Sequence, residues 1–149
     1  MSKKAKADKI IRNHVLWAIG VSAVPIPFVD IVGVTAIQLD MLKQLSRLYK
    51  IDFDANKGKA LITSLVGTSL VGSLAASGRV IGEYGRAVSW ASTMLLQGAL
   101  TYAIGELFLS GIEEGCKSIL DLDLDKASEF FDGAVEKGKE YVEQLVREK

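Results

Sequence analysis

Three long stretches without a charged side chain set the strongest limit on how this chain folds. They cover residues 15–29, 60–78 and 87–105 of a sequence of 149 residues. A helix needs about 20 mostly apolar residues to cross the hydrocarbon of a bilayer. The second and third stretches approach that length, although about half of the second is Gly, Ser and Thr, and the first stretch is too short. Two interpretations stay open: apolar helices embedded in lipid, or a soluble bundle whose central helices are buried on every side.

The apolar residues recur at helical spacing almost throughout, and no run alternates with period two between turn residues. The sequence therefore predicts an all-α fold, made of helical hairpins in a bundle of about five helices. We expect a single domain over residues 1–149. The expected helices, with approximate ends, cover residues 3–23, 30–49, 52–78, 86–118 and 125–148.

The first hairpin is broken by Pro25-Ile26-Pro27. Proline lacks an amide donor and disfavours the α region for the residue before it, so the first helix has to end there. Asp30 follows at the position of an N-cap, and we expect it to cap the second helix. Asp52 or Asp54 is in turn expected to cap the third helix.

Small residues recur at every fourth position in the second uncharged stretch and at every seventh in the third. Such stripes let two helix backbones approach closely. The stripes can meet each other inside one chain, or one of them can meet another subunit, and the pattern leaves both open. The abundance of apolar residues in so small a chain favours a homo-oligomer. The residues are Ser64, Thr68, Gly72 and Ala76 in one stripe, and Ala91, Gly98 and Gly105 in the other.

Charge is unevenly distributed along the chain. Residues 1–59 hold ten Lys and Arg against five Asp and Glu, whereas residues 106–149 hold six against twelve. The amphipathic last helix has a mostly acidic outer face, which is unlike an interfacial membrane helix, so we expect it to pack on protein. The N-terminal cations suit anionic lipid headgroups, or belong to a solvated chain end. They are Lys3, Lys4, Lys6, Lys9 and Arg12.

No motif points to catalysis, a cofactor, a metal or nucleic acid. Cys116 is the only cysteine and His14 the only histidine, and we expect His14 at a surface or interface. The aspartates at 121, 123 and 125 lack the glycine and glutamate of a calcium loop. Residues 57–59 lack the first glycine and the Ser/Thr of a phosphate loop. We therefore expect a protein that is not an enzyme.

Several segments resemble a bacterial family of unknown function that is often described as a GTPase-associated domain. They run from Ile10-Ile-Arg-Asn-His to Pro25-Ile-Pro-Phe-Val-Asp30, then through Thr35-Ala-Ile-Gln-Leu-Asp-Met-Leu42 and Gly58-Lys-Ala-Leu-Ile62. The resemblance covers about residues 10–112 and leaves out the acidic last helix. It implies an α-helical, membrane-associated module with no established enzymatic activity, and some members of the family are fused to or encoded with Era-like or dynamin-like GTPases. It transfers no site residues, and a GTPase partner rests on analogy alone.

The sequence thus favours a membrane-associated helical module that assembles with itself and serves a GTPase system. It would lie on the cytoplasmic side of the inner membrane, or in the cytoplasm, since a lone cysteine suits a reducing compartment. One alternative is a soluble adaptor that docks and regulates a GTPase. Another is a soluble helical bundle that forms a closed homo-oligomer.

Overall fold

The structure is a computed structural model, and it describes residues 2–22, 29–65, 83–113, 115 and 124–147. The labelled helices are α1 (Lys3–Ser22), α2 (Val29–Tyr49), α4 (Glu83–Glu113) and α5 (Leu124–Arg147). Residues 55–65 are also helical, and apart from an isolated bridge residue at Asp52 the described residues are free of β-structure. The all-α prediction is confirmed. The largest difference between the expected and the observed helix ends is at the C-terminus of α4, which ends at Glu113 and not near residue 118.

Two helix starts show how the sequence sets the boundaries. Ser2 Oγ accepts a hydrogen bond from the amide of Ala5 at 3.1 Å, which caps α1. Asp54 Oδ1 accepts hydrogen bonds from the amides of Asn56 at 2.9 Å and Lys57 at 3.2 Å. Of the two aspartates considered for the third helix, Asp54 is therefore the N-cap.

The end of α2 is a Schellman motif built without glycine. The amide of Ile51 donates to the carbonyl of Ser46 at 2.9 Å, and the amide of Lys50 donates to that of Arg47 at 3.4 Å. Lys50 has a positive φ of 56°, in the left-handed region that favours glycine. A lysine at this position carries some backbone strain.

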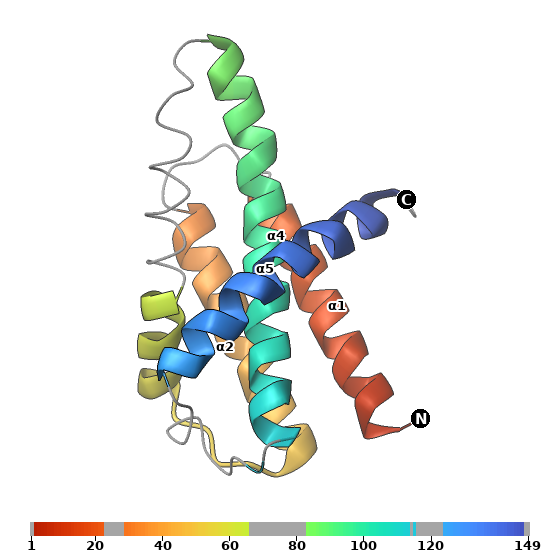
Figure 1. Cartoon of the computed structure of the whole chain (residues 1–149), viewed down its shortest axis with the longest axis vertical. Helices are drawn as coiled ribbons and strands as arrows, with labels where there is room; N and C mark the ends of the chain where they lie inside the picture. Colours follow the sequence, from red (N-terminus) through yellow and green to blue (C-terminus); the bar gives the residue numbers. More distant parts are fainter. Residues whose placement is uncertain (1, 23–28, 66–82, 114, 116–123, 148–149) are drawn as a thin grey trace.

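Helix α4 is the centre of the bundle and contacts α1, α2 and α5. Helix α1 runs antiparallel to both α2 and α4. A Cβ placed on Gly33 would lie 2.8 Å from Val21, and one on Gly98 would lie 3.0 Å from Ile19. Helix α5 crosses α4 obliquely, as Figure 1 shows. The first hairpin is therefore formed as predicted, and its turn at residues 23–28 lies outside the described residues.

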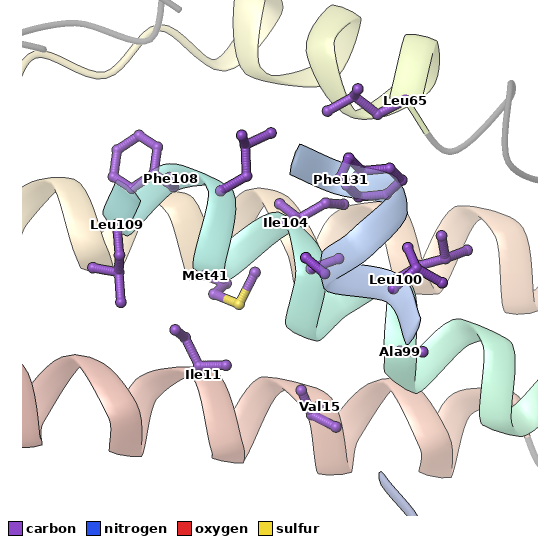
Figure 2. Close-up of a cluster of buried hydrophobic side chains, with 14 of the residues drawn as sticks. Ile11, Val15, Met41, Leu65, Ala99, Leu100, Ile104, Phe108, Leu109 and Phe131 are labelled. Carbon is purple, nitrogen blue, oxygen red and sulfur yellow. The ribbon is translucent and has the colours of Figure 1, made fainter. Parts of the chain in front are cut away.

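The core is a continuous apolar cluster contributed by every described helix. Figure 2 shows Ile11 and Val15 of α1 and Met41 of α2 facing the α4 side chains, with Phe131 of α5 among them. Phe131 is 1% exposed. A remaining cavity of about 10 Å³ between residues 61–65, α2 and α4 is at the lower limit for one water molecule. The described core is thus close-packed.

The amphipathic last helix packs on protein, as the sequence predicts. Its buried face includes Ala127, Ala134, Val142 and Leu145, and Gly138 lies directly on the α4 backbone. A Cβ on Gly138 would lie 2.7 Å from the carbonyl oxygen of Ala99 and 2.9 Å from its Cα. Glycine at 138 is what lets the two helices approach this closely.

Candidate functional site

The two glycines of the predicted small-residue line in α4 are close-contact points inside the bundle. Gly98 lies against Ile19 of α1 and Val142 of α5, and Gly105 lies against Ile11 of α1 and Met41 of α2. Neither glycine faces the helical residues 55–65 in these contacts. The pairing of this line with the stripe of the third helix, one of the two alternatives, would involve residues 68, 72 and 76, which lie outside the described residues, so both alternatives stay open.

Other residues of the predicted stripes and turn are only partly covered by the structure. Ser64 is exposed at the end of the described helical residues 55–65 and makes an interaction there. The side chain of Ala91 and the capping of α2 by Asp30 lie outside the described part, so both stay predictions. The same holds for Pro25, Pro27, Thr68, Gly72 and Ala76.

The predicted basic patch occupies the first half of α1, where Lys3, Lys4, Lys6, Lys9 and Arg12 are all exposed. Lys4 Nζ lies 3.8 Å from Asp8, and Lys3 Nζ lies 6.0 Å from the ring centroid of Tyr49. Because Tyr49 ends α2, this contact places the basic patch at the end of the bundle where α1 begins and α2 stops. Contact with headgroups stays a prediction.

His14 is buried, and the expectation of a surface position was wrong. Its side chain is 2% exposed because α2 covers it. Nε2 lies 2.8 Å from Asp40 Oδ2, and Nδ1 lies 2.6 Å from the carbonyl oxygen of Ile10. A carbonyl oxygen and an ionised carboxylate only accept hydrogen bonds, so both contacts are satisfied when both ring nitrogens carry hydrogen.

Asp40 links this buried ring to the surface. The hydrogen bond from His14 lowers the pKa of Asp40, against the opposite effect of partial burial. Gln44 Nε2 donates a second hydrogen bond to the same carboxylate at 2.6 Å, which also favours the ionised form. The exposed Trp17 ring lies with its centroid 5.1 Å from that of His14. The polar atoms of His14 and Asp40 have hydrogen-bond partners within the bundle, so we interpret the group as structural.

A second polar contact crosses the core at nearly the same level of the bundle. Gln38 Nε2 donates to Thr101 Oγ1 at 3.1 Å, and Thr101 Oγ1 donates to the carbonyl of Gln97 at 2.9 Å. All three residues are buried. Together with His14 and Asp40 they form a polar layer, a name we use for these five residues.

On one side of this layer, α1, α2 and α4 each contain an uncharged segment. Asp30, Glu83 and Arg86 lie beyond these segments, and α5 brings Glu143 and Arg147 beside them. We call the following segments the charge-free end: residues 15–22 of α1, 31–37 of α2 and 87–96 of α4. These segments come together because α1 runs antiparallel to α2 and α4, so its C-terminal half lies beside the N-terminal halves of the other two. Sequence reasoning identified uncharged stretches, but their gathering at one end depends on the helix directions (Figure 1).

An open apolar groove lies at the charge-free end, where α5 crosses α1 and α4. Its volume is about 340 Å³. Ile19, Met94 and Leu95 line it from α1 and α4, and α5 supplies Val142, Glu143, Val146 and Arg147. Val146 is 59% exposed. The groove was not predicted from the sequence. Three helices form it, and the point at which they cross cannot be read from any one segment.

The segment Met94–Glu113 of α4 is the one candidate for a membrane span among the described residues, judged by length and composition. It is 67% buried inside the bundle, where α1, α2 and α5 cover it. The described residues also contain no group of three His, Cys, Asp or Glu side chains placed to hold a metal ion. The aspartates at 121, 123 and 125 lie outside the described side chains.

Comparison with known proteins gives a family and a relative. The family described as "Domain of unknown function (DUF697)" matches residues 2–146. The match is longer than the resemblance over residues 10–112, because it includes α5. No solved structure matches the chain.

The relative is "Magnetosome membrane protein 22" of Magnetospirillum gryphiswaldense, which is 35% identical over 139 residues. The alignment covers 89% of this chain and 70% of the relative. The family match thus spans all the described helices, α5 included up to residue 146. The chain belongs to the DUF697 family of domains of unknown function.

Proposed function

We propose that this protein is a non-enzymatic helical module that associates with a membrane through its charge-free end. The gathering of three uncharged helix segments at one end of the bundle carries the proposal. Monomeric soluble domains rarely expose large contiguous apolar patches unless these serve as an interface. The name of the relative from Magnetospirillum gryphiswaldense, a magnetosome membrane protein, supports a membrane rather than another apolar partner.

In this function the intact bundle contacts the lipid, and α4 does not cross the membrane by itself. Residues 94–113 are covered by α5, whose outer face carries Glu136, Lys137 and Glu140. Placing that face in hydrocarbon is expensive for each charged side chain. In this orientation the basic first half of α1 lies at the opposite end of the bundle and faces the cytoplasm, away from the lipid.

Two finer features belong to the same proposal. Self-assembly would rest on the stripe at 64, 68, 72 and 76, since the glycines of α4 already have partners within the bundle. A GTPase partner would follow from the family resemblance. The alternative functions are a soluble adaptor that docks and regulates a GTPase, and a soluble bundle that forms a closed homo-oligomer.

Flotation of the purified chain with phospholipid vesicles tests the proposed function. We expect the chain to float with vesicles, and in cell extracts to stay in the membrane fraction until detergent is added. Molecular mass in mild detergent and in detergent-free buffer measures self-assembly separately. A chain that stays with the soluble protein in both experiments contradicts membrane association, and a monomer in both buffers contradicts self-assembly.

A further inference from the structure

The groove at the crossing of α1, α4 and α5 is open and mostly apolar. Gly98 lies beneath two of its lining residues, since a Cβ there would lie 2.8 Å from Val142 and 3.0 Å from Ile19. The lack of a side chain at 98 brings those two residues together over α4. Val146 then projects beside them with more than half of its surface in water. The result is an apolar groove that the described residues leave uncovered.

The size of the groove distinguishes between two possible occupants, a hydrocarbon chain and a second copy of this protein. Its volume of about 340 Å³ falls in the range of roughly 300–1,000 Å³ that is usual for sites binding small molecules. Seven residues line it. A stable dimer interface uses about 20–30 residues from each partner. The groove is therefore large enough for a hydrocarbon chain and too small to hold a second copy of this protein by itself.

The charges at the rim fit a phospholipid headgroup. Glu143 and Arg147 stand one helical turn apart on the outer side of α5, and both are exposed. No ion pair joins these two side chains, which are both among the described residues. A zwitterionic headgroup carries a phosphate and an ammonium, which match the guanidinium of Arg147 and the carboxylate of Glu143.

We propose that the groove between α1, α4 and α5 binds an acyl chain of a bilayer phospholipid, with Arg147 at the phosphate and Glu143 at the ammonium. The inference rests on the proposed membrane association and names the surface responsible for it. Binding needs no opening of the bundle, because the groove is already open. It also places the last turn of α5 at the level of the headgroups.

A matched pair of substitutions on α5 tests this assignment. Val146 in the groove and Phe130 outside it are both exposed apolar residues, about 24 Å apart along the helix. Val146→Asp and Phe130→Asp add the same charge. Vesicle affinity is measured by flotation with phosphatidylethanolamine and phosphatidylcholine. We expect Val146→Asp to weaken binding about tenfold or more, because a carboxylate would enter an apolar contact, and Phe130→Asp to change it less than about twofold.

A fluorescence measurement with the same two positions gives an independent result. Val146→Trp and Phe130→Trp are each made in a chain with Trp17→Phe and Trp90→Phe. Vesicles whose acyl chains carry bromine should quench the tryptophan at 146 and leave the one at 130 bright. If the background chain does not fold, the aspartate pair still decides.

Several results would overturn the groove assignment. Equal loss of binding in both aspartate variants, or loss in neither, would place the lipid contact elsewhere while the proposed membrane association stands. A lipid-free dimer that Val146→Asp turns into a monomer would make a second copy the occupant. Failure of the unmodified chain to float would instead remove the proposed function, and the groove assignment with it.

Discussion

Gly138→Ala probes the packing of α5 on α4, on which both the buried span and the groove depend. The new Cβ would lie 2.7 Å from the Ala99 carbonyl oxygen and 2.9 Å from its Cα. Both are backbone atoms, which cannot rotate away as a side chain can, so α5 has to move outward. Overpacking of this kind costs about 1–3 kcal/mol.

Gly133→Ala supplies the control on the same helix, since a Cβ there would meet nothing within 4 Å. Alanine is favoured over glycine inside a helix by about 1 kcal/mol, and this gain applies at both positions. Gly133→Ala should therefore stabilise the protein by about 1 kcal/mol. Gly138→Ala should destabilise it by up to about 2 kcal/mol. The difference between the two variants cancels the helix propensity and equals the overpacking cost of about 1–3 kcal/mol.

Urea unfolding followed by far-UV circular dichroism measures both free energies of unfolding. Gly138→Ala should also loosen α5, so the tryptic cleavage sites within it should become more accessible. Equal stabilisation by the two substitutions would refute the close approach of α5 to Ala99. It would also remove the reason for treating Met94–Glu113 as a covered core segment.

Substitutions at three further positions test local features by the same urea-unfolding measurement. Asp40→Leu leaves the buried Nε2 of His14 without an acceptor and should lower the free energy of unfolding by about 1–3 kcal/mol. Asp40→Asn keeps an acceptor and should lower it less. Equal losses of stability in the two variants would contradict the hydrogen bond between His14 and Asp40. Folding lowers the pKa of Asp40. The stabilisation that its carboxylate contributes to the folded protein is therefore complete above the pKa of Asp40 in the unfolded chain, and is lost as the pH falls through the lower pKa in the folded protein. The unmodified protein should therefore lose more stability below about pH 4 than Asp40→Asn does, and parallel acid profiles would argue against this. Lys50→Gly relieves the left-handed backbone at the end of α2 and should stabilise by up to about 1 kcal/mol, while a loss would show that Lys50 has compensating contacts. Asp54→Ala removes the N-cap of the helical residues 55–65 and should cost about 0.5–2 kcal/mol, and no change would contradict the capping.

Local sequence signals predicted most of the described helices. The ends of α1, α2 and α5 fall within about two residues of the expected positions, because the proline break and the apolar periodicity act over one or two helical turns. The acidic outer face of α5 correctly indicated packing on protein. Asp54 was predicted as one of two possible caps, and only the hydrogen bonds of Asn56 and Lys57 separate it from Asp52.

Features that depend on tertiary contacts could not be predicted in the same way. His14 looks like a surface residue because it follows a basic segment, and its burial depends on Asp40, which is 26 positions away. Gly98 and Gly105 were recognised as close-contact positions, but their partners come from α1, α2 and α5. The groove likewise required the crossing angle of α5. The spacing of residues along a helix indicates which face carries small side chains, but it does not indicate which other helix packs against that face.

Fluorescence of the native tryptophans tests the central claim most directly. Trp17 and Trp90 both belong to the uncharged segments, and Trp17 is 55% exposed. A second chain with Trp17→Phe, Trp90→Phe and Tyr49→Trp carries its reporter at the opposite end of the bundle. With vesicles whose acyl chains are brominated, we expect strong quenching of the native tryptophans and little quenching at position 49. A chain that binds the vesicles and shows more quenching at position 49 would contradict membrane contact through the charge-free end.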